Sequence, residues 1–243
     1  MLFAEFRQVY LQHPTTALLV FDFDGTLAPI VSTPGQARLD VQLRQPLERL
    51  SNQTNVIIIS GRPTDYLEEQ FAGIGIHLIG NYGRPETLEP TDQTLLEALV
   101  RRARQELPTA ILVEEKPSSL ALHYRRAPDR ASEVLAWSRR QEREYDVALD
   151  FGKSVVEVSV GDRSDKGTVL RRLAGGHSAV LYAGDDVGDI PAMKALQEFD
   201  MPTCGLAIAS EQSPTELSVL ADESISRSQF VHYLVSLTSV PTT

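Results

Sequence analysis

Short apolar runs alternate with amphipathic stretches at both ends of the chain. The runs are rich in β-branched residues and lack polar alternation, which is typical of parallel strands buried on both faces. We predict such strands at residues 16–23, 55–60, 76–80, 178–186 and 204–209. Apolar positions at helical spacing between them predict helices at residues 41–50, 64–71, 166–173 and 190–199. Strand–helix alternation of this kind predicts a doubly wound, Rossmann-like α/β core.

The middle of the chain breaks this rhythm. The pattern there predicts a helix, two strands, a second helix and two further strands, at residues 95–106, 110–115, 120–126, 130–145, 147–151 and 154–158. This αββαββ order predicts an α+β domain with an antiparallel sheet and helices on one of its faces. Turn-forming residues flank the segment. We therefore predict an inserted cap domain at residues 89–160 and a catalytic core formed by residues 1–88 and 161–243.

Charge and composition narrow the possible partners. The chain has 243 residues and a formal net charge of -10, which argues against nucleic acid or an anionic membrane surface as the main partner. Its single cysteine, Cys204, cannot form an internal disulfide, and a reducing compartment is expected. Neither a signal peptide nor an apolar stretch of roughly 20 residues is evident. These features predict a cytoplasmic protein.

Four of the predicted strands end in polar or charged residues, at the edge where open α/β sheets bind ligands. The first ends at Asp22 and Asp24, and the others end at residues 60–62, 80–83 and 184–189. A single such end is explained by a turn, because Asp-Gly is a common turn sequence. Acidic residues at the ends of two strands would repel each other without a cation, and hard oxygen ligands suit Mg²⁺.

Asp22 and Asp24 suit two different tasks in phosphoryl transfer. One carboxylate can take up the phosphoryl group as an aspartyl-phosphate, and the other can protonate the leaving alkoxide and later deprotonate water. Mg²⁺ would neutralise the charge of the carboxylate and the phosphate as they approach. The alternative is that both residues only form a polar end to a hydrophobic strand.

Two further segments carry groups that bind phosphate. Ser60, Gly61 and Arg62 precede a predicted helix, where a hydroxyl and backbone amides can form a phosphate cradle. Taken alone, Ser60 is more simply interpreted as a helix N-cap. Lys166 lies in a first helical turn after Asp165, where the helix dipole disfavours a cation. An anionic partner explains Lys166 better than exposure to solvent, which is the alternative for any lysine.

The predicted insert holds a second polar cluster. On the strand predicted at residues 120–126, His123 and Arg125 share one face, and Glu114, Lys116 and Glu157 can join them. Acids and bases together suit a ligand rich in hydroxyl groups. A solvated sheet face with cross-strand ion pairs explains the spacing equally well.

Once these segments are placed in order, the chain resembles a known family. DFDGT, SGR, DKG and GDDVGD are similar to the four motifs of the haloacid dehalogenase superfamily, and the position of the insert resembles its C2-capped phosphatases. Within these, EEKPSSLALHYRRAP and VVEVSV resemble the cap motifs of trehalose-6-phosphate phosphatases. Tyr82 and Gly188 depart from the family pattern, which usually has histidine and threonine at these places.

The resemblance implies a role for each matching position. Asp22 would be the nucleophile and a Mg²⁺ ligand, and Asp24 would be the acid/base that also binds Mg²⁺ through its backbone carbonyl. Asp185 would complete the metal site with Asp189 in support. Phosphate would be held by Ser60 and Lys166, and the distal sugar by Glu114, Lys116, His123, Arg125 and Glu157.

The first functional hypothesis is therefore a Mg²⁺-dependent phosphatase that hydrolyses trehalose 6-phosphate through an aspartyl-phosphate. One alternative is a related phosphatase for another phosphorylated sugar, such as sucrose 6-phosphate or mannosyl-3-phosphoglycerate. Others are a phosphomutase, which returns the phosphate to the sugar, and an inactive sugar-phosphate sensor. The sequence does not indicate an oligomeric state or a trehalose-phosphate synthase partner.

Overall fold

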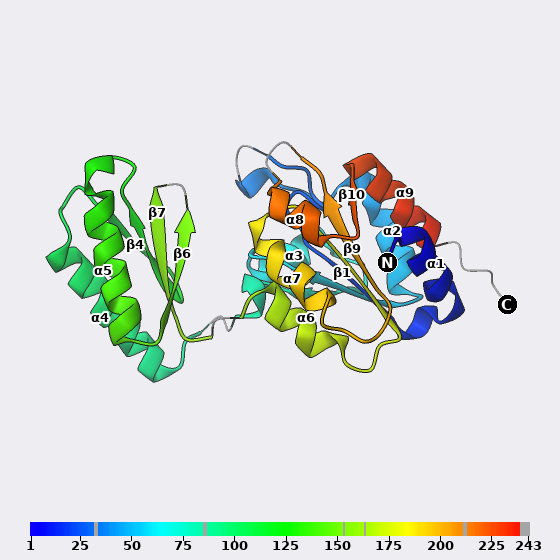
Figure 1. The fold of residues 1–243 in the computed structure, drawn as a ribbon, viewed down its shortest axis with the longest axis horizontal. Coiled ribbons are helices and arrows are strands. Elements are labelled where there is room, and N and C mark those ends of the chain that lie inside the picture. The colour runs from blue at the N-terminus through cyan, green and yellow to red at the C-terminus, as the bar shows by residue number, and fades with distance from the viewer. Residues whose placement is uncertain (32–33, 85–86, 153, 163, 211–212, 239–243) are drawn as a thin grey trace. The chain divides into compact units, whose positions relative to one another are not determined.

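The computed structural model describes residues 1–31, 34–84, 87–152, 154–162, 164–210 and 213–238 of the chain. The chain separates into two compact units, which are residues 1–83 with 164–243 and residues 84–163 (Figure 1). The predicted insert, residues 89–160, falls inside the second unit. All four predicted strand-end segments lie in the first unit.

A six-stranded parallel sheet forms the centre of the first unit, in the order β10-β9-β8-β1-β2-β3 (Figure 1). Its strands are β1 (Ala17–Phe21), β2 (Asn55–Ile59), β3 (His77–Ile79), β8 (Ala179–Gly184), β9 (Thr203–Ile208) and β10 (Glu223–Ile225). The chain leaves β1 for β2 on one side and returns at β8 on the other. The carboxyl end of β1 therefore lies at the switch point where such sheets bind ligands.

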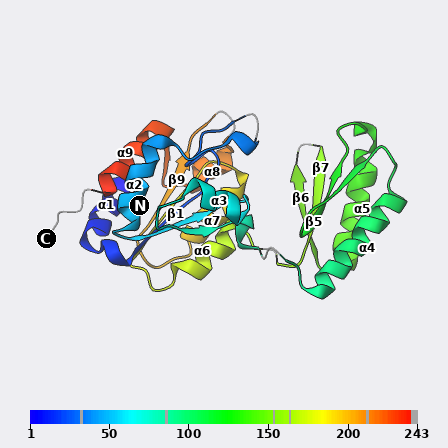
Figure 2. The same ribbon diagram turned by 180° about the vertical axis from the view of Figure 1, so that it is seen from behind.

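Helices cover both faces of this sheet, as the views in Figures 1 and 2 show. Leu19 and Phe21 of β1 pack on one side with α1 (Phe3–Gln12), α2 (Val41–Ser51), α3 (Thr64–Gln70) and α9 (Arg227–Leu237). Leu18 and Val20 pack on the other with α6 (Lys166–Ala174), α7 (Ile190–Leu196) and α8 (Thr215–Leu220). Because both faces of β1 are buried, its sequence shows no polar alternation. The predicted doubly wound fold is confirmed.

The second unit contains a four-stranded antiparallel sheet in the order β4-β5-β7-β6. Its elements are α4 (Pro90–Glu106), β4 (Leu112–Glu115), β5 (Ser119–His123), α5 (Ala131–Glu144), β6 (Val147–Gly152) and β7 (Val155–Val160). Leu120, Leu122, Val156 and Val158 form its core with apolar side chains of both helices. The helices lie on one face of the sheet (Figure 1), which confirms the predicted αββαββ insert.

Two predicted boundaries in this unit differ from the observed ones by more than two residues. Helix α4 begins at Pro90 and not at residue 95, since proline is well tolerated in a first helical turn, where no hydrogen bond from its nitrogen is needed. Strand β5 ends at His123, because Tyr124 starts a turn in which the Ala127 N–H donates to its carbonyl. Arg125 therefore lies in that turn and not on the strand.

The remaining regular segments are short 3₁₀ turns at Pro14–Thr16, Pro34–Gln36, Asn81–Gly83, Pro128–Arg130 and Val187–Asp189. Two of them, Asn81–Gly83 and Val187–Asp189, begin within three residues of strand ends of the parallel sheet. Among the helices that the structure describes, none has the length and apolar character needed to span a membrane.

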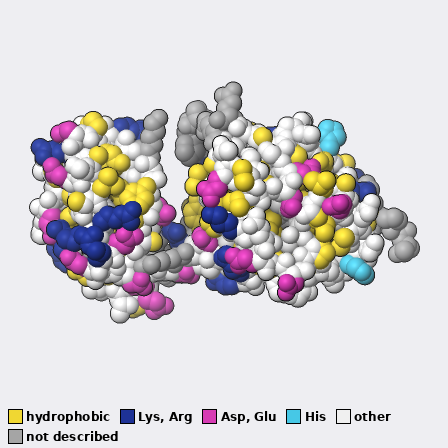
Figure 3. Space-filling model, in the orientation of Figure 1, with side chains coloured by type: hydrophobic (Ala, Val, Ile, Leu, Met, Phe, Trp, Pro, Cys, Tyr) yellow, Lys and Arg dark blue, Asp and Glu magenta, His cyan; other side chains and the backbone are white. Residues whose placement is uncertain are grey.

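Arginine and lysine side chains gather on the visible face of the second unit, beside acidic side chains (Figure 3). Arg102 and Arg140 of the two helices both pair with Glu106, and Arg139 pairs with Glu142 at 2.8 Å. Ion pairs between and along the helices therefore involve at least three arginines of this unit.

Candidate active site

Asp22 lies at the carboxyl end of β1. Its backbone N–H donates to the carbonyl of Ala183 on β8 at 2.9 Å, so the ladder continues one residue beyond the strand. Only 4% of the residue is exposed. A carboxylate buried to this extent needs charged or hydrogen-bonding partners, and the neighbouring strand ends supply them.

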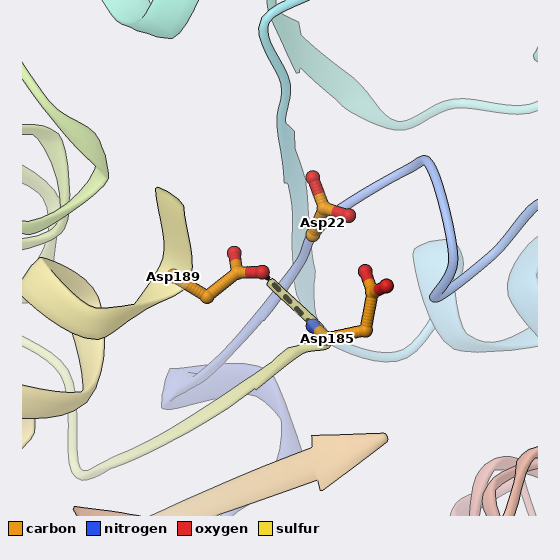
Figure 4. Close-up of side chains that lie close together, drawn as sticks. All are labelled: Asp22, Asp185 and Asp189. Atoms are coloured by element: carbon orange, nitrogen blue, oxygen red, sulfur yellow. Dashed lines mark hydrogen bonds between the residues drawn. The ribbon is translucent and has the colours of Figure 1, made fainter. Parts of the chain in front are cut away.

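Three carboxylates from two strand ends meet at this point. Oxygens of Asp22, Asp185 and Asp189 lie within 4.8 Å of one another, and all three residues are buried (Figure 4). Hard oxygen donors grouped in this way fit Mg²⁺, which typically takes one or two protein carboxylates and keeps other positions for water or phosphate.

Asp189 already has four donors. Its Oδ1 accepts from Lys166 Nζ at 2.6 Å and from the Tyr182 hydroxyl, and its Oδ2 accepts from the backbone N–H groups of Asp185 and Asp186. An ionised carboxylate offers about four lone-pair sites, so the protein itself occupies those of Asp189. Its carboxylate thereby fixes the turn that carries Asp185.

Lys166 is the first residue of α6 and is almost fully buried, at 3% exposed. Its Nζ lies 2.6 Å from Asp22 Oδ1 and 2.6 Å from Asp189 Oδ1. Asp165 caps the helix by accepting from the Thr168 N–H at 2.7 Å. The prediction that Lys166 has an anionic partner is confirmed, and the alternative of a solvated surface lysine is wrong.

Burial and charge shift the acid–base properties of the cluster. Burial raises the pKa of Asp22 well above its usual range, although Lys166 opposes the shift. Burial, together with the charges of Asp189 and Asp186, raises the pKa of Asp185 to about 7. Burial would lower the pKa of Lys166, but Asp189 and Asp22 outweigh it and raise that pKa well above the usual value. A divalent cation beside Asp22 and Asp185 would favour their ionised forms.

A pocket of about 240 Å³ lies beside the cluster. It is lined by Asp22, Asp24, Ser60, Gly61, Arg62, Tyr82, Lys166 and Asp186. The structure thus brings the predicted phosphate-binding residues together around one opening, next to Asp22, the predicted nucleophile. These residues are Ser60, Gly61, Arg62 and Lys166. The volume of the pocket is sufficient for a phosphate group.

Ser60 is buried at the end of β2, and its Oγ accepts from the Arg62 N–H at 3.1 Å. Helix α3 begins only at Thr64, with Pro63 at the N-cap position. The interpretation of Ser60 as a helix N-cap is therefore wrong. The hydroxyl lines the pocket instead.

Tyr82 forms one wall of the pocket in a strained backbone conformation. Its φ is 57° and its ψ is 27°, in the left-handed region that aromatic residues rarely occupy. The Tyr82 N–H donates to the carbonyl of Ser60 at 2.9 Å, which holds this conformation. A Cβ on Gly61 would lie 2.5 Å from the Tyr82 hydroxyl, so glycine is needed for the ring to fit. Tyr82, which stands where the family pattern usually has histidine, is thus part of the pocket wall.

Asp24 lies at the pocket with its side chain paired to Arg62. The guanidinium donates from Nε to Oδ2 at 2.8 Å and from Nη2 to Oδ1 at 2.6 Å. The Arg62 guanidinium also lies 4.8 Å from the centroid of the Tyr66 ring. Asp24 is therefore near the pocket but outside the group of three carboxylates.

Four of the five predicted cap residues lie on the sheet face opposite α4 and α5. Glu114, Ala121 and Glu157 stand in one row across β4, β5 and β7. His123 Nε2 lies 2.7 Å from Glu114, and Lys116 Nζ donates to Glu157 at 2.7 Å. A second oxygen of Glu157 accepts from the Ser119 hydroxyl at 2.6 Å. Four of the five predicted residues thus form two close pairs on one face, the His123–Glu114 contact and the Lys116–Glu157 ion pair.

Arg125, the fifth, lies in the turn after β5. It lines a groove of about 960 Å³ at the edge of the sheet, together with His123 and Arg126. The groove is otherwise formed by the end of α4, the following loop and β4. The structure therefore keeps Arg125 close to the predicted cluster through His123, although not on the strand.

Sequence reasoning missed two residues that support the site. Tyr182 of β8 is fully buried and donates to Asp189. A hydroxyl inside the apolar run of β8 was a usable signal, because a buried tyrosine usually needs a partner. Arg227 of α9 donates to the carbonyls of residues 25–28, at 2.8–3.4 Å, and to Asp40 at 3.0 Å. Nothing in the sequence near Arg227 indicates that it contacts residues 25–28 and Asp40.

Comparisons with known proteins identify the family of the chain. The model of the trehalose-phosphatase family matches residues 20–224. The chain is 31% identical over 206 residues to the trehalose-phosphate phosphatase of Mycolicibacterium paratuberculosis, covering 76% of this chain and 52% of that protein. It is 30% identical over 190 residues to a probable trehalose-phosphate phosphatase of Sinorhizobium fredii, covering 70% of each.

The fold has solved counterparts as well. The trehalose-6-phosphate phosphatase of Aspergillus fumigatus superposes with a TM-score of 0.79 at 24% identity, over 98% of this chain and 97% of that one. At that identity the likeness concerns the fold alone. The chain spans about half the length of the mycobacterial relative. Because the family model covers most of the chain, including both strand ends that carry the acids, the chain belongs to the trehalose-phosphatase family.

Proposed function

We propose that this chain is a Mg²⁺-dependent phosphatase that hydrolyses trehalose 6-phosphate to trehalose and phosphate. The observation that carries the proposal is the buried contact of Asp22 with Lys166 beside a phosphate-sized pocket. This contact supports a reaction in which Asp22 is the nucleophile and Lys166 binds the same phosphate. Family membership adds the substrate, since the relatives are described as trehalose-phosphate phosphatases.

In this function the residues of the first unit carry out phosphoryl transfer. Asp22 attacks phosphorus and forms an aspartyl-phosphate, while Asp24 protonates the leaving sugar oxygen and then takes a proton from the attacking water. Ser60, the backbone of Gly61, Arg62 and Lys166 bind the phosphate oxygens. The contact of Lys166 with Asp189 does not involve Asp22, so we expect it to hold Lys166 in place when Asp22 is phosphorylated.

The acids of this unit also suit a bound Mg²⁺. Asp22 and Asp185 would hold it through their side chains, and Asp24 through its backbone carbonyl. Asp189, whose oxygens have protein donors, would act in support by orienting Asp185 and Lys166. When bound, Mg²⁺ supplies positive charge that lowers the repulsion between the Asp22 carboxylate and the phosphate.

The polar face of the second unit would recognise the sugar. Glu114, Lys116, His123 and Glu157 present hydrogen-bond donors and acceptors on one sheet face, and Arg125 adjoins them. Burial would raise the pKa of Glu157, but the hydrogen bonds from Lys116 and Ser119 outweigh it and lower that pKa below its usual value. An ionised glutamate of this kind is a strong acceptor for sugar hydroxyls.

The direct test is release of phosphate from a panel of sugar phosphates in Mg²⁺. We expect trehalose 6-phosphate to give the highest kcat/KM, and sucrose 6-phosphate and mannosyl-3-phosphoglycerate to be poor substrates. Appearance of an isomeric sugar phosphate in place of free phosphate would indicate a phosphomutase. Binding without turnover of any ester would refute the proposed activity.

Two adjacent glutamates of β4 offer a matched test of sugar recognition. Glu114→Gln is expected to lower kcat/KM for trehalose 6-phosphate by roughly 10- to 150-fold, the effect of leaving a charged hydrogen bond unmade. Hydrolysis of p-nitrophenyl phosphate should be nearly unchanged, because that ester has no sugar. Glu115→Gln, on the other face of the same strand, should leave both rates as they are. Equal losses on both esters in Glu114→Gln would place Glu114 outside sugar recognition.

Gly25 tests whether the position of Asp185 matters for activity. Its φ is +83°, and an added Cβ would lie 2.0 Å from Asp185 Oδ2. Gly25→Ala is therefore expected to displace this carboxylate and lower the phosphatase rate at least about tenfold. The left-handed backbone of this residue should also cost roughly 1–2 kcal/mol of stability. Rates and melting temperatures should be compared with those of Gly75→Ala, where a Cβ meets nothing within 4 Å. A fully active Gly25→Ala enzyme would contradict the role of Asp185.

A further inference from the structure

The pair between Asp24 and Arg62 poses a problem for the proposed reaction. Asp24 must present a protonated oxygen to the leaving group, yet both of its oxygens accept from one guanidinium, at 2.8 and 2.6 Å. A two-bonded pair of this geometry occupies both carboxylate oxygens and points them at the arginine. While it is paired with Arg62, Asp24 therefore cannot also present a protonated oxygen to a leaving group.

The charges around the pocket indicate what can release it. Among the described residues that line the pocket, Lys166 and Arg62 are the cations. Lys166 is enclosed by Asp22 and Asp189, both at 2.6 Å. Arg62 has Asp24 as its only ion-pair partner in the described part of the chain. An arriving phosphate dianion thus finds Arg62 the more available cation, and a guanidinium binds phosphate with the same two-bonded geometry as carboxylate.

The loop around Arg62 allows the side chain to move while its backbone stays fixed. The Arg62 N–H donates to Ser60 Oγ at 3.1 Å, and its carbonyl accepts from the Asn81 N–H at 2.9 Å. The guanidinium lies over the Tyr66 ring at 4.8 Å, a contact that tolerates sliding because it has no fixed hydrogen-bond direction. A change of partner therefore needs only side-chain rotation.

We propose that Arg62 exchanges partners during the reaction: it holds Asp24 when the pocket is empty and moves to the substrate phosphate when the pocket is filled. This inference rests on the proposed phosphatase function. Substrate binding then both fixes the phosphate and frees the acid/base. The enzyme thereby presents its proton donor only when an ester is in place.

The proton and phosphoryl balance follows from this exchange. Freed Asp24 takes a proton from solvent and gives it to the leaving sugar oxygen as the bond from that oxygen to phosphorus breaks and the bond from Asp22 forms. In the second step Asp24 takes a proton from water as the remaining hydroxide attacks phosphorus and the bond to Asp22 breaks. Phosphate leaves, Asp24 returns its proton to solvent, and Arg62 pairs with it again.

A double-mutant cycle on binding of inorganic phosphate with Mg²⁺, measured by calorimetry, tests the exchange without requiring turnover. Arg62→Gln should weaken phosphate binding roughly 10- to 150-fold, the effect of a lost charge-assisted bond. Asp24→Asn should tighten it, because Arg62 no longer has a charged competitor, and this gain should disappear in the Arg62→Gln background. Arg171→Gln, which breaks an equally two-bonded but exposed pair with Glu198, should bind like wild type.

Kinetics distinguish partner exchange from fixed positioning. Under exchange, Arg62→Gln raises KM for trehalose 6-phosphate and p-nitrophenyl phosphate by the same factor. If Arg62 instead held Asp24 throughout turnover, the variant would resemble Asp24→Asn, with a far greater loss on the sugar ester and a burst of p-nitrophenolate. That result would overturn the inference, as would unchanged phosphate binding in Arg62→Gln or a gain from Asp24→Asn that persists without Arg62. An enzyme inactive on every ester would refute the proposed function, while the binding cycle would still decide on Arg62.

Discussion

Replacing Asp22 by asparagine is expected to lower the kcat of the phosphatase reaction at least about a thousandfold. The amide has the same shape but cannot take up the phosphoryl group. The fold should persist, because the change removes a buried negative charge while Lys166 keeps its contact with Asp189. Phosphate release and the melting temperature are the two measurements.

The control for this variant is Asp200→Asn, which changes an exposed aspartate ahead of β9, at the amino end of the sheet. It should retain the wild-type rate. If Asp22→Asn kept more than a few per cent of that rate, another group would have to be the nucleophile, and the reaction proposed for this site would need revision.

Removal of divalent ions is expected to have an effect of similar size. Dialysis against EDTA should reduce turnover to a trace, and added Mg²⁺ should restore it, because Asp22 and Asp185 repel each other and the phosphate without a cation. Without metal, the pKa of Asp185 is raised to about 7 by burial and by Asp189 and Asp186. Below that pH a proton competes with Mg²⁺ for Asp185. The Mg²⁺ concentration needed for half-activation should therefore rise about tenfold for each pH unit by which the pH falls.

The same shift predicts how stability depends on pH. The folded state holds a proton on Asp185 up to about pH 7, whereas the unfolded chain releases it near pH 4. Stability of the metal-free protein should therefore fall as pH rises through this window, and Mg²⁺ should reverse the loss. Thermal unfolding should show a larger Mg²⁺-induced increase in melting temperature at pH 8 than at pH 6. Full activity after thorough chelation, or an equal increase at both pH values, would contradict a metal site at Asp185.

Much of the core was predictable because its signals are local. Each residue of β1 is buried, so the apolar run and the acids at its end appear directly in the sequence. The same holds for β8 and the turn at Asp185 to Asp189. Strand β10, by contrast, has three residues at a sheet edge and includes Glu223, which gives no strand pattern. Its pairing with β9 depends on packing that the local sequence does not encode.

The site was predictable in its composition but not in its contacts. The motifs indicated which acids and cations meet, since strand order brings them to one edge. They did not reveal that Arg62 pairs with Asp24, because the two residues lie 38 positions apart and either could equally face the pocket. The end of β5 at His123 was missed for a related reason. Tyr124 continues the alternation of the strand, and only its bonds to Ser154 and Ala127 turn the chain away.

The contact of Arg227 with the carbonyls of residues 25–28 bears on how the protein is made. During synthesis the strand that ends at Asp22 leaves the ribosome about two hundred residues before Arg227, which braces the loop behind it. The nascent chain can thus contain every motif of the reaction and still lack a braced loop at Gly25 and Thr26. We expect docking of α9 to complete that support, so that activity would begin only once the last described helix has folded.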